Sequence, residues 1–114
     1  MNLENTKAQM RKGILEYCIL SVLSKNEAYA SELIQKLTEA ELLVVEGTIY
    51  PLLTRLKNDG LLTYRWEEST GGPPRKYYMV TTLGLNFLAE LKKTWAAMVA
   101  SVNRVTGSEG EGRR

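Results

Sequence analysis

Apolar residues recur at helical spacing along three successive stretches of the chain. These stretches run from about residue 7 to residue 23, from Tyr29 to Glu39, and from residue 47 to residue 59. Each has one apolar face and one polar face, which predicts three amphipathic helices that share a core. The polar residues 1–6 predict a frayed terminus, and Gly13 inside the first helix predicts a close contact with another helix.

The third of these helices, residues 47–59, carries a second face that is rich in hydrogen-bonding groups. Its buried stripe consists of Ile49, Leu52, Leu53 and Leu56, and its other positions include Thr48, Tyr50, Thr54, Arg55 and Lys57. Pro51 fits the first turn of a helix, where its missing N–H would be unpaired anyway. The helix therefore either begins near Thr48, which then caps it, or begins earlier and bends at Pro51. Asp59-Gly60 predicts its end.

A different period follows this helix. Leu62, Tyr64 and Trp66 alternate with polar residues over 61–68, which predicts a strand. Residues 69–74, Ser-Thr-Gly-Gly-Pro-Pro, form the strongest turn signal of the chain. Residues 75–81 alternate again and predict the return strand of a hairpin, with Arg75 and Lys76 at its tip.

A long helix is predicted to start at Thr81 or Thr82 and to end near Val105. Its apolar residues are spaced by alternate steps of three and four: Leu88, Leu91, Trp95, Met98, Val102 and Val105. Such a heptad stripe is typical of a helix that packs along another helix. The complete order predicts a mainly α fold with a small β-hairpin. We expect a winged helix-turn-helix over residues 1–81, a C-terminal dimerisation helix over 82–106 and a disordered tail over 107–114.

Composition narrows the classes of function. The 114 residues include one cysteine and no histidine, which excludes Cys/His zinc sites and Ser–His or Cys–His nucleophile pairs. Without clustered carboxylates or a phosphate-binding loop, the sequence predicts no enzyme, no cofactor and no metal. The net charge of +2 permits nucleic-acid binding without demanding it. No apolar run is long enough to cross a bilayer, so we expect a cytoplasmic protein without a membrane partner. Cys18 is expected to be a small buried hydrophobe, with a redox switch as the alternative.

Several motifs in this order resemble the PadR family of bacterial winged-helix transcriptional regulators. They are Met10 to Tyr17, Tyr29-x-x-Glu32-Leu33, Gly47-Thr-Ile-Tyr-Pro51, Arg55-Leu56, Asp59-Gly-Leu61, Gly72 to Tyr78 and Thr81-x-x-Gly84. The single final helix is similar to that of the smaller subfamily. Pro73-Pro74 departs from the pattern, because relatives often place another basic residue in the wing.

The resemblance implies a homodimeric repressor that binds a pseudo-palindromic double-stranded DNA operator. The helix at 47–59 would enter the major groove, and the wing at 69–76 would contact backbone or minor groove. The expected DNA-binding residues are Tyr29, Ser31, Thr48, Tyr50, Pro51, Thr54, Arg55, Gly72, Arg75, Lys76 and Tyr78. The expected dimer interface consists of Met10, Ile14, Leu88, Leu91, Trp95, Met98 and Val102. A small planar aromatic effector is implied at Trp95, Met98 and Ala96.

Other interpretations of the same residues stay open at this point. Thr48 caps the helix or binds DNA, Arg55 faces phosphate or pairs with Asp59, and Trp95 is dimer core or a ligand platform. One of Tyr77 and Tyr78 is expected in the core, with the other available to a phosphate. A winged-helix module that binds proteins instead of DNA is the alternative function, and near-neutral charge in the recognition region favours it.

Overall fold

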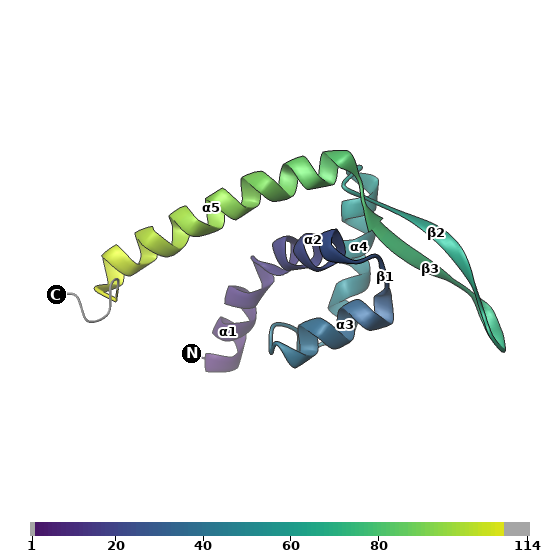
Figure 1. Cartoon of the computed structure of the whole chain (residues 1–114). Helices are drawn as coiled ribbons and strands as arrows, with labels where there is room; N and C mark the ends of the chain where they lie inside the picture. The colour runs from purple at the N-terminus through teal and green to yellow at the C-terminus, as the bar shows by residue number, and fades with distance from the viewer. Residues whose placement is uncertain (1, 109–114) are drawn as a thin grey trace.

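The computed structural model describes residues 2–108. Its helices are α1 (Leu3–Lys12), α2 (Leu15–Lys25), α3 (Ala30–Glu39), α4 (Ile49–Asn58) and α5 (Thr82–Thr106), with a 3-10 turn, η1 (Glu46–Thr48), before α4. Its strands are β1 (Ala28–Tyr29), β2 (Leu62–Ser69) and β3 (Gly72–Val80). Figure 1 shows α2, α3 and α4 grouped together, with the β2–β3 hairpin projecting from one side and α5 extending away from the other. The predicted mainly α fold with a small hairpin is confirmed.

The core lies among α2, α3 and α4. Its fully buried side chains are Ile19 and Leu20 from α2, Leu33 and Leu37 from α3, Ile49, Leu53 and Leu56 from α4, and Leu62 from β2. Every one of them is aliphatic, and no polar or charged residue is buried in the part of the chain that the structure describes. The hydrophobic stripes that the periodicity predicted therefore meet, and they hold α4 by one face only.

The first predicted helix is in fact two helices. The chain leaves helical hydrogen bonding at Gly13-Ile14, and α1 and α2 are joined there at an angle (Figure 1). Gly13 makes no close contact with another helix of its own chain, since no atom lies within 4 Å of where its Cβ would be. Of residues 1–6, which were predicted to be frayed, residue 1 lies outside the described residues and the others form the capped start of α1. The Asn2 side chain accepts hydrogen bonds from the backbone N–H groups of Glu4 and Asn5 at 2.9 and 3.2 Å. This cap supplies partners for two otherwise unpaired donors.

The start of α4 follows the first of the two predicted alternatives. Thr48 occupies the N-cap position and Pro51 lies in the first turn, so α4 does not bend there. The Thr48 side chain makes no capping hydrogen bond. After Asn58 the chain turns at Gly60, whose φ of 81° favours glycine, and enters β2.

The three strands form one antiparallel sheet in the order β1-β3-β2. β1 is only two residues long and was not predicted, because two residues cannot establish an alternating pattern. The predicted turn at 69–74 is too long, since β3 already begins at Gly72 and includes both prolines. The prediction that Arg75 and Lys76 lie at the tip is wrong. Arg75 pairs with Glu67 and Lys76 with Trp66 along the strands of the hairpin.

The joint between the hairpin and α5 is tightly packed. The Thr81 hydroxyl donates a hydrogen bond of 2.7 Å to the carbonyl of Gly60 and accepts one of 2.9 Å from the N–H of Gly84. A Cβ on Gly84 would lie 2.1 Å from the carbonyl oxygen of Leu61. Glycine at this position therefore lets the first turn of α5 touch the start of the wing, which fixes the direction of α5.

α5 covers the predicted range Thr82–Thr106 and ends at Gly107, whose φ of 76° is left-handed. Its predicted stripe divides in two. Leu88 and Leu91 pack against the core of their own chain, whereas Met98, Val102 and Val105 are exposed. Of the predicted disordered tail, residues 109–114 lie outside the described residues. Among the described helices, none combines the length and the apolar character needed to cross a membrane.

Candidate nucleic-acid interface

The outer face of α4 presents polar groups to solvent. Ile49, Leu53 and Leu56 are buried on the inner face, so Tyr50 and Thr54 stand on the outer one, together with Pro51. Tyr50 is 53% exposed, so its ring is not packed into the core. Hydroxyl groups held on a rigid helix can bond to phosphates or to the edges of bases. The outer face of α4 therefore has the chemistry of a recognition surface.

Arg55 takes a different partner from the one the sequence predicted. Its Nε donates a hydrogen bond of 2.7 Å to Oε2 of Glu16 on α2, and a second guanidinium nitrogen contacts the same oxygen. The predicted pair with Asp59 is wrong, because Asp59 is the C-cap residue of α4 and Glu16 lies closer in space. No sequence signal connects residues 39 positions apart, so the Glu16 contact could not be predicted. Arg55 thus links α4 to α2.

One face of the wing brings three of the predicted site residues together. The guanidinium carbon of Arg75 lies 3.9 Å from the ring centroid of Tyr29, and Tyr29 meets Tyr77 edge-on at 5.0 Å. Gly72 and Arg75 line a hollow of 560 Å³ that Tyr29 also borders. Ser31 is exposed in the first turn of α3, next to this group. A cation stacked on an aromatic ring keeps a defined position without giving up its charge.

The opposite face of the wing carries a row of aromatic rings, of which Tyr78 was a predicted site residue and Tyr64 and Trp66 were not. Tyr78 is half-buried, Tyr64 packs beside it at 5.7 Å, and Trp66 follows at 5.8 Å with 61% of its surface exposed. Lys76 lies 4.6 Å from the Tyr64 centroid, and Lys57 of α4 lies 5.8 Å from it. The alternation of residues 62, 64 and 66 put the two rings on one face, but it gave no sign that Trp66 stays exposed.

Of the two adjacent tyrosines of β3, Tyr78 is the one that packs against the core. Burial raises the pKa of its phenol, with smaller contributions from Tyr64 and Tyr50. The hydroxyl therefore stays protonated and able to donate a hydrogen bond. The predicted DNA contact by Tyr78 has to be made from this half-buried position, whereas Tyr77 lies on the other face with Tyr29.

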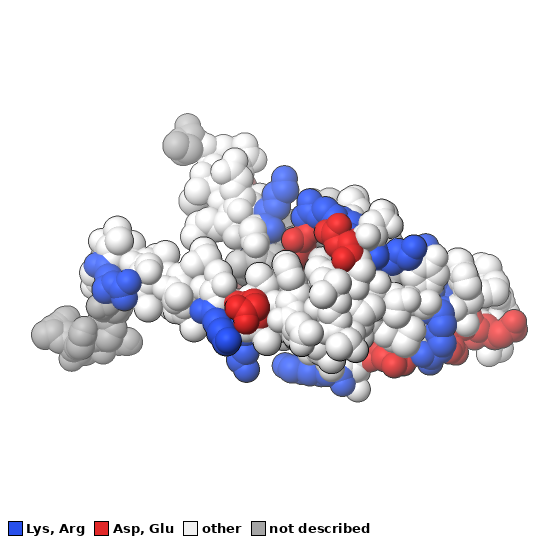
Figure 2. Space-filling view, turned by 90° about the horizontal axis from the view of Figure 1, so that it is seen from above, with Lys and Arg blue, Asp and Glu red and all other residues white. Residues whose placement is uncertain are grey.

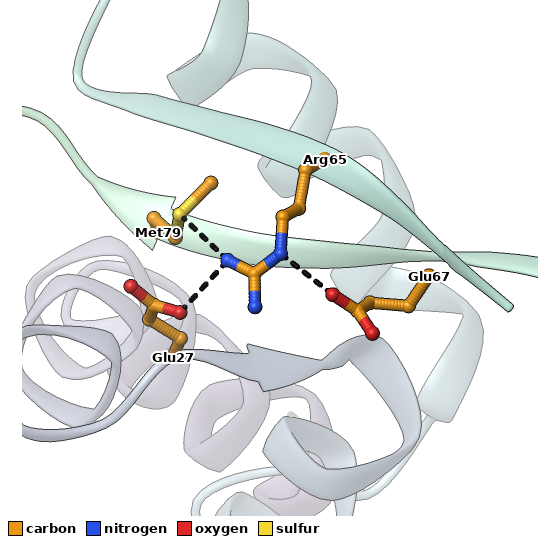
Figure 3. A network of polar contacts seen from close by, with 4 residues as sticks. All are labelled: Glu27, Arg65, Glu67 and Met79. Carbon is orange, nitrogen blue, oxygen red and sulfur yellow. Dashed lines mark hydrogen bonds and ion pairs between the residues drawn. The ribbon is translucent and has the colours of Figure 1, made fainter.

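The cations of the wing differ in whether a carboxylate neutralises them. Arg65 donates to Glu67 at 2.6 Å and to Glu27 at 3.0 Å, and it also contacts the sulfur of Met79 at 3.4 Å (Figure 3). The hydrogen bonds that Arg65 donates to Glu67 and, with a smaller effect, to Glu27 raise the pKa of Arg65 above its ordinary value. Lys57, Arg75 and Lys76 form no ion pair within residues 2–108. The charge of each of these three cations is thus available to a phosphate.

A second surface lies where α1 and α2 face α5. An apolar groove of 530 Å³ runs between them, and the residues that line it include Met10, Ile14, Tyr17, Leu91, Trp95, Met98 and Val102. The Tyr17 and Trp95 rings lie 6.4 Å apart across it. Six of the seven residues expected at a dimer interface therefore share one surface, and Leu88 lies on the inner side against the core. Tyr17 was not predicted here, because it was assigned to the apolar face of a continuous first helix.

One expectation about this groove needs correction, and so does the expected burial of Cys18. Ala96 does not line it, because one residue along a helix turns the side chain by about 100° away from Trp95. Cys18 is only partly buried, and burial raises the pKa of its thiol, which keeps the group protonated and unreactive.

Seen from above, the face that carries α5 shows positive and negative side chains interspersed, with neither forming a continuous patch (Figure 2).

A three-helix core with a hairpin wing and a long C-terminal helix is the architecture of a winged helix-turn-helix regulator. Residues 19–90, well over half of the chain, match the model of the transcriptional regulator PadR-like family. The chain belongs to this family, which confirms the resemblance seen in its motifs and implies regulation through DNA binding.

Solved structures agree with this assignment. The chain is 62% identical to a PadR-like transcription factor from Bacteroides fragilis, with a TM-score of 0.74 over 89% of this chain and 98% of that one. It is 42% identical to a PadR-like transcriptional regulator from Bacillus cereus, with a TM-score of 0.76 over 90% and 99%. A PadR family regulator from Eggerthella lenta is 32% identical, with a TM-score of 0.83 over 91% of each chain.

Proposed function

We propose that this protein is a homodimeric transcriptional repressor that binds a pseudo-palindromic DNA operator. The observation that carries the proposal is that Lys57 of α4 and Lys76 of β3 both lie over the Tyr64 ring and form no ion pair within residues 2–108. Arg75, which also forms no ion pair there, lies on the other face of the wing over Tyr29. In this proposal residues 1–81 form the DNA-binding unit and residues 82–106 the dimerisation helix. Occupying a promoter would block transcription.

A second copy of the chain is the proposed occupant of the groove. Trp95, Met98 and Val102 border the groove and remain exposed on α5, and Met10 on α1 is 73% exposed. α5 has 25 residues and is therefore about 37 Å long, more than the core of one small domain needs. Such a continuous exposed apolar surface is typical of a protein–protein interface. The apolar stripe of α5 would pack against α1 and α5 of the partner.

DNA contact in the dimer would use α4 twice. The two copies of α4 would enter successive major grooves about one helical turn apart, with Tyr50, Thr54, Thr48 and Pro51 facing the bases or the backbone. Arg75, Lys76, Gly72, Tyr29 and Ser31 would contact phosphates beside them. The cation–π contacts of Arg75 and Lys76 support this assignment. They hold the two cations over the rings of Tyr29 and Tyr64 before DNA binds.

Titration on the DNA upstream of the protein's own gene tests this function. We expect saturable gel-shift binding whose affinity falls steeply as salt rises, because phosphate neutralisation releases counterions. Random DNA of equal length serves as the control and should bind more weakly. Equal affinity for both fragments, or no salt-sensitive binding, would favour the protein-binding module instead.

A planar aromatic effector is the proposed signal for release. Tyr17 and Trp95 face each other across the groove at 6.4 Å, and a flat ring could stack on either. We expect planar aromatic compounds to quench Trp95 emission and to weaken operator binding in the same concentration range. The Trp95→Phe variant should keep operator binding and lose the quenching. If no compound changes either the Trp95 emission or operator binding, Trp95 only packs in the dimer interface and binds no effector.

A further inference from the structure

The first turn of α2 contacts two functional surfaces through neighbouring residues. Glu16 binds Arg55 of α4 with a hydrogen bond of 2.7 Å to Nε. Tyr17, the next residue, lines the groove and faces Trp95. One peptide unit therefore connects the partner of the recognition helix to the wall of the groove.

The first turn of α2 can transmit a displacement, because its core-facing side is anchored whereas its junction with α1 is not. Leu15, Ile19 and Leu20 are buried and anchor α2 in the core. The α-helical hydrogen bonding of α1 ends at Gly13-Ile14, immediately before the first turn of α2, so α1 does not continue α2 and hold it from that side. Met10, Gly13 and Ile14 all line the groove, so whatever fills the groove touches this joint directly.

The contact on the α4 side is specific. Arg55–Glu16 is the one ion pair that α4 makes within residues 2–108. The buried side chains of α4 are all aliphatic, and Lys57 adds a looser contact, 5.8 Å from the centroid of the Tyr64 ring. Apolar packing fixes the distance of a helix from its neighbours more strongly than its rotation, whereas two guanidinium nitrogens on one carboxylate oxygen fix an orientation. Glu16 is one-third exposed, so solvent weakens this pair without abolishing it.

We infer that Glu16 is a positioning residue for the recognition helix, and that the Tyr17–Glu16–Arg55 connection couples the groove to DNA affinity. This inference rests on the proposed function. Arg55 acts here by holding α4 in the rotation that presents Tyr50 and Thr54, and it does not contact phosphate. By linkage, operator binding at α4 must also change the surroundings of Trp95.

Four variants separate positioning from phosphate contact. Glu16→Gln and Arg55→Gln should each weaken binding to the upstream fragment by about tenfold, since a dimer loses two pairs each worth roughly threefold. The slope of log affinity against log salt should stay unchanged in both, because no phosphate contact is lost. The exchange Glu16→Arg with Arg55→Glu should restore affinity. Glu90→Gln, which removes a paired glutamate on α5, is the control and should bind like wild type.

The opposite results identify a phosphate contact. In that case Arg55→Gln would lower the salt slope by about 2 per dimer, Glu16→Gln would leave affinity unchanged or raise it, and the charge exchange would bind worst. Any of these three outcomes would overturn the inference. Thermal unfolding of each variant at equal concentration shows whether a loss of affinity comes from a loss of folding instead.

Trp95 emission provides the readout for the coupling. In a Trp66→Phe background Trp95 is the remaining tryptophan, since the chain has two. We expect the upstream fragment to change its emission, and Glu16→Gln to abolish that change at saturating DNA. A change that persists in Glu16→Gln, or that is missing with Glu16 intact, overturns the coupling alone. Failure of the unmutated chain to bind the fragment would overturn the proposed function and this inference together.

Discussion

Replacing Trp95 with aspartate should leave the protein monomeric. Trp95 is 42% exposed on α5 and borders the groove that the partner is proposed to fill. A dimer would place two unpaired carboxylates in an apolar interface, at a cost of roughly 4 kcal/mol or more, which is about a thousandfold in the dissociation constant. Sedimentation velocity at micromolar concentration should show the change from dimer to monomer. Operator binding should fall with it, because the two half-sites would be bound independently.

Ala100→Asp is the matched control for this experiment. Ala100 is exposed on the opposite side of α5 from Trp95, so the same charge enters the same helix without entering the stripe. This variant should sediment like wild type. If Trp95→Asp stays dimeric while its fold is intact, the stripe of α5 is not the interface, and the dimer must form elsewhere.

Removing Tyr50 and Arg75 together should abolish high-affinity operator binding. Tyr50 is the aromatic residue of α4 and is 53% exposed, and Arg75 has no carboxylate partner within residues 2–108. The double variant Tyr50→Ala with Arg75→Ala removes four contacts from a dimer, so we expect a loss of at least about a hundredfold. The salt slope should fall by about 2, one phosphate for each Arg75. Gel-shift titrations at several salt concentrations measure both quantities.

The control for this double variant is Arg104→Ala. It removes an exposed arginine near the far end of α5, at the opposite end of the molecule from the wing (Figure 1). Its affinity and salt slope should match those of the unmutated chain. A Tyr50/Arg75 double variant that binds the operator like wild type would place the DNA contact elsewhere, and would favour a winged-helix module that binds proteins.

The secondary structure was largely predictable, because it follows from local periodicity. The stripe Ile49, Leu53, Leu56 and the stop at Gly60 define α4 without reference to the rest of the chain. The secondary-structure prediction failed where the apolar spacing continued although the chain changed direction. Apolar spacing runs on through Met10, Ile14 and Tyr17, so the sequence predicted one helix where the structure has a joint.

The wing shows the same limit in another form. Gly71 occupies a left-handed conformation with a φ of 76°, which ends the turn early and lets β3 begin at Gly72 despite two prolines. An edge or projecting hairpin tolerates proline, because the missing N–H is not needed in the interior of a sheet. Arg75 and Lys76 therefore lie along the hairpin, where they can stack on Tyr29 and Tyr64.

By itself the sequence determined the order of elements except for β1 and the joint between α1 and α2, and it determined the family motifs and the absence of histidine chemistry. These depend on residue identity and on spacing over one or two turns of chain. Only the tertiary structure decided that Arg55 pairs with Glu16, that Leu88 turns inward while Trp95 lies on the groove, and that Arg65 is neutralised but Arg75 is not. Each of these outcomes depends on which side chains are brought together by packing from distant parts of the chain. Periodicity along the sequence specifies a face of a helix or strand, but it does not specify what that face meets.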